Sequence, residues 1–142
     1  RGLKLLIDGR NECKPDGYYI GPTIFDNVPN NDDLAQNEVF GPVASIQSWE
    51  NEEDVIKIAN DTIYGLAAGI WTKDVNKAIR IADRIEAGTV YINNYFNAST
   101  QSPVGGFKQS GYGRENGWEG MQSYMQTKST WLATNPSQPD PF

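Results

Sequence analysis

Short apolar runs alternate along the chain with longer stretches whose apolar residues recur at helical spacing. The short runs predict strands, because each is only a few residues long and lies between turn-forming residues. They cover residues 3–7, 42–49, 66–71 and 89–92, and residues 18–25 form a further extended segment broken by Gly21-Pro22. The first run, LKLLI, has the composition of a buried strand.

Two of the longer stretches carry clear helix signals. Asn51 is a good N-cap, and the carboxylates that follow it meet the free N–H groups and the positive dipole end of the first turn. Residues 74–87 place their apolar side chains on one face, and Gly88 then supplies a stop signal. Residues 30–38 form at most a short helix, and residues 117–125 predict another short one.

The alternation of strands and helices predicts the α/β class, a βαβ segment whose crossover helices connect the strands of a parallel sheet. A long loop, residues 93–115, follows this pattern. Residues 128–134 then predict a last strand, with Trp131 on one face and Leu132 on the other. A strand that is apolar on both faces is typically covered on both sides, whereas the proline-rich tail 135–142 is expected to be flexible.

Length and composition exclude several classes of protein. A chain of 142 residues is one domain or part of a larger one, and its net charge of −6 argues against nucleic-acid binding. No apolar run is long enough for a membrane helix, and the N-terminal residues do not resemble a secretory signal. The single cysteine fits a reducing compartment, so we expect a cytoplasmic protein. With no histidine and one cysteine, this chain cannot hold a His-based triad or a tetrahedral zinc site.

The stretch PVGGFKQSGYGRE, residues 103–115, gathers four glycines around Lys108 and raises the question of phosphate binding. The dinucleotide fingerprint fails, because Gly117 comes one residue too late after Gly111 and Gly113. Lys108 also lacks the frame of a P-loop. Tight turns are therefore the favoured interpretation, and a nucleotide-binding module is disfavoured.

Five separated motifs resemble, in the same order, the C-terminal half of the catalytic domain of aldehyde dehydrogenases. They are NEVFGPV (37–43), YGLAAGIWTKD (64–74), AGTVYIN (87–93), SPVGGFKQSGYGREN (102–116) and YMQTKS (124–129). The GREN ending is similar to that of betaine-aldehyde-like members. The resemblance implies a catalytic-domain segment over 1–127 and an oligomerisation strand over 128–134, followed by a flexible tail over 135–142. It also implies a homodimer or homotetramer.

The resemblance implies that Glu38 accepts hydrogen bonds from the nicotinamide-ribose hydroxyls of NAD or NADP, with Phe40 packed beside that ribose. A carboxylate is a strong acceptor for two neighbouring hydroxyls, which makes this role chemically sensible. Leu66 is a further candidate for the same pocket. The alternatives are a surface glutamate that caps a short helix, a core phenylalanine and a buried strand leucine.

The resemblance also implies that residues 94–104 line an aldehyde tunnel, with Phe96, Ala98 and Val104 at its variable positions. Because Ala98 and Val104 are small, we expect a tunnel that is either wide or polar near Asn97 and Ser99, and an ordinary surface loop is the alternative. Glu115 matches a supporting glutamate near the active site, and the glycines are expected to form a close-packed wall. In some relatives, carbonyls near Lys108 and Gly111 hold a potassium ion, a possibility that the sequence leaves open.

The activity implied is oxidation of an aldehyde to a carboxylic acid, through a cysteine thiohemiacetal and hydride transfer to NAD(P)+. The family's nucleophile, general base and dinucleotide-binding glycines all lie upstream of the matching region. Cys13, in a turn-rich segment with no identifiable base, is an ordinary exposed thiol rather than a nucleophile. We therefore expect part of a larger enzyme, inactive without its N-terminal half. The alternative is a structural or binding protein that retains the fold without the chemistry.

Overall fold

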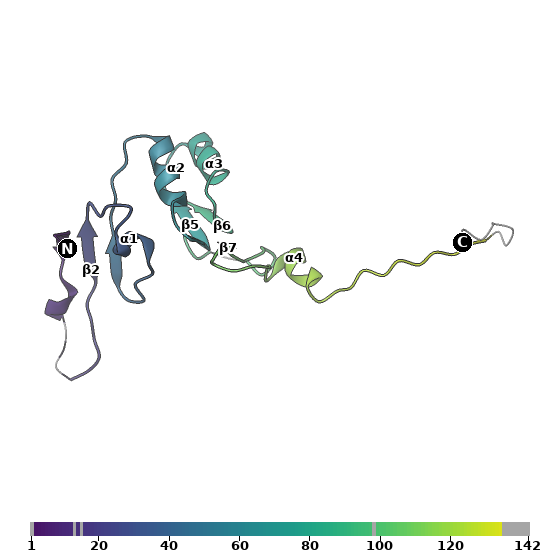
Figure 1. The fold of residues 1–142 in the computed structure, drawn as a ribbon, viewed down its shortest axis with the longest axis horizontal. Helices are drawn as coiled ribbons and strands as arrows, with labels where there is room; N and C mark the ends of the chain where they lie inside the picture. Colours follow the sequence, from purple (N-terminus) through teal and green to yellow (C-terminus); the bar gives the residue numbers. More distant parts are fainter. Residues whose placement is uncertain (1, 13, 15, 98, 135–142) are drawn as a thin grey trace.

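The computed structural model describes residues 2–12, 14, 16–97 and 99–134, which form short strands and helices in mixed order (Figure 1). The strands are β1 (Lys4–Ile7), β2 (Thr23–Asp26), β3 (Val43–Ser45), β4 (Tyr64–Gly65), β5 (Ala67–Ile70), β6 (Thr89–Ile92) and β7 (Phe107–Lys108). The helices are α1 (Asp33–Gln36), α2 (Glu52–Asn60), α3 (Val75–Ala82) and α4 (Gly117–Gln122), and a 3-10 turn η1 covers Gly9–Glu12.

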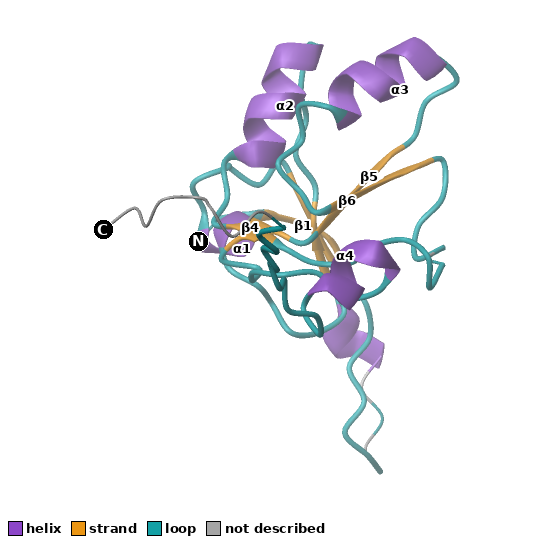
Figure 2. Cartoon of the chain, turned by 90° about the vertical axis from the view of Figure 1, so that its right-hand side faces the viewer, coloured by secondary structure: helices purple, strands orange, loops and turns teal. Residues whose placement is uncertain are grey.

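Two parallel strand pairs confirm the predicted α/β class. β2 pairs in parallel with β3 across the connection that contains α1, and β5 pairs in parallel with β6 across α3. In the described part of the chain, β3 and β5 belong to different sheets, and β1 runs antiparallel to β2. The antiparallel pair β4–β7 is a third small sheet. α2 and α3 lie on the same side of the β5–β6 pair (Figure 2).

The helices begin where the sequence predicts but end earlier. The side chain of Asn51 accepts a hydrogen bond from the Asp54 amide at 3.1 Å, and Asp74 caps α3 in the same way. α3 ends at Ala82 rather than near 87, and Gly88 is not its stop. The turn that follows is bound by the side chain of Asn60, whose Nδ2 donates to the carbonyl of Arg84 at 2.8 Å and whose Oδ1 accepts from the N–H of Glu86 at 2.9 Å. α1 and α4 are likewise short.

The buried core is small. Among the described residues, only Val28, Ile56, Ala78 and Ile81 are buried hydrophobic side chains. β1, predicted to be buried, is exposed along its length, because neither of its faces is covered by another layer. The accessible surface is 11609 Å², against about 7,300 Å² for a compact monomer of this mass. The segment thus presents far more surface, much of it apolar, than a compact domain of its size.

The predicted strand over 128–134 is not formed within this chain. Residues 126–134 run away from α4 as an irregular extended segment, with Trp131 93% and Leu132 83% exposed (Figure 1). A strand needs neighbouring N–H and C=O groups, and no described part of the chain lies beside this segment. Its pairing with a second subunit stays a prediction, and the tail 135–142 lies outside the described residues. No helix in the described ranges has the length and hydropathy to cross a membrane.

Candidate functional site

Glycines bring three backbone segments into close contact at the centre of the candidate site. Gly65 in β4 pairs with Phe107 in β7, and the N–H of Gly88 donates to the Gly65 carbonyl at 3.0 Å. A Cβ on Gly88 would lie 2.8 Å from the carbonyl carbon of Gly105 and closer still to its oxygen. Only glycine permits this approach of backbone to backbone. The glycines are therefore closely packed, and the aldehyde tunnel that they would border stays a prediction.

The glycine-rich loop closes on itself. Val104 and Glu115 form an antiparallel bridge, with N–H···O distances of 2.8 and 2.7 Å between their backbones. The guanidinium of Arg114 donates to the carbonyls of Gly113 and Gly106 and lies 5.4 Å from the ring centre of Phe107. These contacts fix the position of Val104, a predicted tunnel residue, relative to Glu115.

The side chain of Lys108, the lysine within the glycine-rich loop, is bound by other groups of the protein. Its Nζ donates to the carbonyls of Asn60 at 2.6 Å and Thr62 at 3.1 Å, and it pairs with Glu86 at 2.7 Å. The carbonyls at the end of α2 carry partial negative charge, so a cation is well placed there. Lys108 thus ties the loop to α2, in agreement with the sequence argument against a phosphate cradle.

Two adjoining pockets meet at Leu66 and Ser110. The first is lined by Glu38, Tyr64, Leu66, Gln109 and Ser110. The second is lined by Leu66, Val104, Gly105, Gly106, Ser110, Gly111, Tyr112, Gly113, Arg114, Glu115 and Ser123. The structure therefore brings Glu38 together with Leu66, and Val104 with Glu115. Leu66 lies between β4 and β5 and is 54% exposed, so the buried-leucine alternative is wrong in this chain.

Two predicted site residues lie outside these pockets. Phe40 is 96% exposed, which rules out the core alternative within this chain but does not place it beside Glu38. Phe96 is also exposed and packs edge-on against Tyr95, with ring centres 4.7 Å apart. Ala98 and Cys13 fall outside the described residues, so their predicted roles are not placed.

Glu38 is not a helix cap. α1 is capped at its start by Asp32, whose side chain accepts from the Leu34 amide at 2.9 Å, and at its end by the backbone of Asn37. Glu38 follows as an exposed residue outside α1 that lines the first pocket. The capping alternative is therefore wrong, and Glu38 instead lines a pocket.

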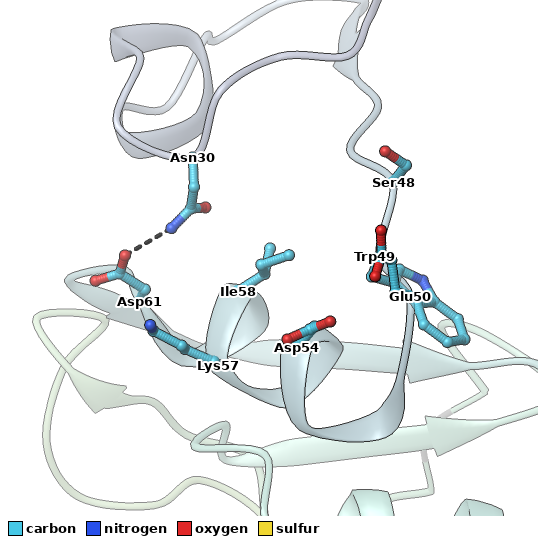
Figure 3. Close-up of a pocket in the computed structure, with 8 residues that line it drawn as sticks. All are labelled: Asn30, Ser48, Trp49, Glu50, Asp54, Lys57, Ile58 and Asp61. Atoms are coloured by element: carbon cyan, nitrogen blue, oxygen red, sulfur yellow. Dashed lines mark hydrogen bonds between the residues drawn. The ribbon is translucent and has the colours of Figure 1, made fainter.

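A separate polar pocket lies beside α2 (Figure 3). It is lined by Asn30, Ser48, Trp49, Glu50, Asp54, Lys57, Ile58 and Asp61. Across it, the Asn30 amide donates to the Asp61 carboxylate at 2.6 Å. Within the described ranges, no three or more His, Cys, Asp or Glu residues are grouped to hold a metal ion. The pocket connects α2 to the loop before α1.

Ion pairs between the helices support the scaffold on which the site rests. Arg84 pairs with Glu53 at 2.5 Å, and Arg80 pairs with Glu52 at 3.0 Å, so the segment that follows β5 is linked to α2. The hydrogen bond from Arg84 lowers the pKa of the Glu53 carboxyl and raises the pKa of the guanidinium. These exposed pairs align α2 with α3, the two helices above the β5–β6 pair.

Comparison with known proteins identifies the family. A sequence profile described as the aldehyde dehydrogenase family matches residues 1–130. The chain belongs to the aldehyde dehydrogenase family. It is 43% identical over 139 residues to a betaine aldehyde dehydrogenase of Bacillus subtilis, covering 96% of this chain and 28% of that protein. It is 52% identical over 114 residues to an aldehyde dehydrogenase of Emericella nidulans, covering 80% of this chain and 23% of that one.

Solved aldehyde dehydrogenases share the fold. A betaine aldehyde dehydrogenase from Staphylococcus aureus in complex with NAD+ matches 99% of this chain with a TM-score of 0.89 and 39% identity. An indole-3-acetaldehyde dehydrogenase of P. syringae, a mutant in complex with NAD+ and IAA, matches 92% with a TM-score of 0.84 and 42% identity. The chain covers 28% and 27% of those two chains. It spans about a quarter of the length of these aldehyde dehydrogenases.

One residue that sequence reasoning missed stands out in this aldehyde dehydrogenase segment. Ser110 lines both pockets, and its Oγ accepts a hydrogen bond from the Gly65 amide at 2.9 Å. It lies at the turn next to Gly106, where a Cβ would collide with the Ser110 backbone. A serine within a glycine-rich loop carries no signal of its own, so only the folded loop reveals its position.

Proposed function

We propose that this chain is the cofactor-facing and substrate-facing part of an NAD(P)+-dependent aldehyde dehydrogenase that oxidises an aldehyde to a carboxylic acid. The observation that carries the proposal is the pair of pockets joined at Leu66 and Ser110. Glu38 lines one pocket, and Val104 and Glu115 line the other. A hydride donor and its acceptor must lie side by side, which two adjoining pockets allow.

The residues of the first pocket fit the ribose of a nicotinamide cofactor. Glu38 offers two carboxylate oxygens, enough to accept from two neighbouring hydroxyls, and Leu66 offers an apolar surface. Such a cofactor supplies the hydride acceptor. The task of this chain is to fix the ribose, with exposed Phe40 available to cover it. The proposed cofactor is NAD+ or NADP+. The two solved relatives described above contain NAD+.

The second pocket is proposed to shape the aldehyde side. Val104 is held by its backbone bridge to Glu115, so its side chain has a defined place in the wall. Phe96 and Ala98 belong to the same loop and are proposed to extend that wall. Glu115 is proposed to support the site through hydrogen bonds. Positioning of this kind lowers barriers by several kcal/mol in general.

The thiol chemistry is proposed to come from the rest of a longer enzyme. The sequence holds no histidine and one cysteine, Cys13. We expect the 142-residue chain by itself to show no aldehyde-dependent NADH formation. The large exposed apolar surface of this chain supports the proposal that the rest of the enzyme packs against it. Trp131 and Leu132 are proposed to pair with a second subunit in a homodimer or homotetramer, in the cytoplasm.

The test replaces Glu38 by glutamine in the full-length protein that carries this chain. Loss of a charged hydrogen bond should weaken the hydride-transfer transition state by about 1–3 kcal/mol, or about 5- to 150-fold. Glu50→Gln, in the separate polar pocket, is the matched control and should leave NAD+ affinity and single-turnover rate unchanged. Equal behaviour of the two variants would refute the role of Glu38. A full-length protein inactive with every aldehyde would favour a non-catalytic member of the fold.

A further inference from the structure

We propose that the exit turn of α2, residues 60–62, is a positioning element that holds both walls of the Glu38–Ser110 pocket in register. The proposal rests on the proposed function of that pocket. Hydrogen bonds converge on this turn from the segment that carries Glu38 and from the loop that carries Ser110. The turn therefore connects the two walls.

The first connection comes from α1. Gln36 is the last residue of α1 and precedes Glu38 by two positions. Its Nε2 donates to the Asp61 carbonyl at 2.8 Å and to the Asn30 carbonyl at 2.6 Å. Asn30 in turn donates to the Asp61 carboxylate at 2.6 Å (Figure 3). The chain that leads into Glu38 is therefore anchored on the exit turn.

The second connection comes from the glycine-rich loop. Lys108 donates to the carbonyls of Asn60 and Thr62, and the next residue, Gln109, donates its N–H to the Ile63 carbonyl at 2.9 Å. Lys108 has a φ of +51°, a conformation that non-glycine residues adopt only when their surroundings fix it. Since Ser110 follows Lys108 within two residues, the exit turn contributes to the position of Ser110, together with the hydrogen bond that the Gly65 amide donates to its Oγ.

A third connection completes the element. The Asn60 side chain donates to the Arg84 carbonyl and accepts from the Glu86 amide, and the Glu86 carboxylate pairs with Lys108 at 2.7 Å. The same segment continues to Gly88, which packs against the glycine wall. Residues from α1, from the loop after α3 and from the glycine-rich loop thus share one small turn.

The proposal predicts coupling between two residues that do not touch each other. In the full-length protein, Gln36→Leu and Lys108→Met should each weaken NAD+ binding about threefold to tenfold. Their combined effect should be smaller than the product of the single effects, because both act through the same turn. Lys4→Met, which breaks a 2.8 Å ion pair with Asp26 far from the pocket, is the matched control and should leave NAD+ affinity unchanged. Lys108→Arg retains a cation and should recover part of the affinity.

A second readout does not depend on the cofactor. Amide hydrogen exchange of residues 33–41 should become faster in Lys108→Met, although Lys108 lies in a distant part of the sequence, and should stay unchanged in Lys4→Met. Unchanged exchange, or independent effects of Gln36→Leu and Lys108→Met, would overturn the proposal. Glu38→Gln, measured alongside, separates the two ideas. If it alone weakens NAD+ binding, the proposed function stands and the positioning role fails. If it has no effect while exchange changes as expected, the positioning role stands and the proposed function fails.

Discussion

Replacing Gly88 by alanine tests the close approach on which the site is built. The position has no unusual backbone conformation, so alanine is disfavoured there only by crowding. Its Cβ would lie 2.8 Å from the carbonyl carbon of Gly105, whereas ordinary contacts begin at 3.4 Å. The obstacle is backbone rather than a flexible side chain, so β6 and the glycine-rich loop would have to move apart.

The magnitude follows from this geometry. Crowding in a well-packed region costs about 1–3 kcal/mol. Reduced freedom of the unfolded chain returns only about 0.4–1 kcal/mol for a glycine-to-alanine change. We therefore expect net destabilisation. The displaced loop carries Val104 and Ser110, and misplacement of a site by about 1 Å can cost about 100-fold in rate. Gly88→Ala should thus lower both the melting temperature and the single-turnover rate of the full-length enzyme.

Gly41→Ala is the matched control, because a Cβ there would meet nothing within 4 Å. Thermal unfolding followed by circular dichroism, together with single-turnover formation of NADH, would measure both effects. The control should have an unchanged or slightly higher melting temperature. If Gly88→Ala matched Gly41→Ala in melting temperature and in rate, the reasoning about the glycine wall would be refuted.

Three further predictions concern the scaffold and assembly. Asn51→Ala should destabilise the protein by about 1 kcal/mol in urea unfolding through loss of the α2 cap, and an unchanged midpoint would contradict the cap's role. Because Arg84 lowers the folded-state pKa of Glu53, the stability from this pair is present above the unfolded carboxyl pKa and is lost as pH falls through the folded value. The stability difference between wild type and Arg84→Met should therefore shrink on acidification, and a constant difference would argue against it. Trp131→Asp should convert oligomer to monomer in light scattering at micromolar concentration, unless the wild type is already monomeric.

Local signals in the sequence were sufficient where an element is determined by its own residues. Asn51 and Asp74 cap α2 and α3 at the predicted starts, because a capping side chain needs only the next turn of the same helix. β6 occupies the predicted residues 89–92, where the run TVYI is short, apolar and rich in β-branched residues. The family itself was identifiable from five motifs in one order.

The remaining features depend on residues far away in the sequence. The turn after α3 is bound by Asn60, a contact that no pattern within 74–87 could reveal. The apolar run of β1 predicts a buried strand, but in this chain no other layer covers its faces. In the site, Glu38 and Leu66 came from the family motifs, but Ser110 emerged only when the loop was folded against β4. The sequence singled out Lys108 among the glycines, but it did not predict that the lysine would bind the carbonyls at the end of α2.

The side-chain amide of Asn60 cannot be exchanged for a carboxylate without the loss of a contact. Its Nδ2 donates and its Oδ1 accepts, so the side chain binds a carbonyl and an N–H at once. Hydrolysis of the amide to a carboxylate would remove the donor and place negative charge against the Arg84 carbonyl. Replacement of the side-chain nitrogen by oxygen would then release the turn after α3. The nearby loops would be held less firmly in place. A carboxylate at position 60 would therefore loosen this turn without any break in the chain.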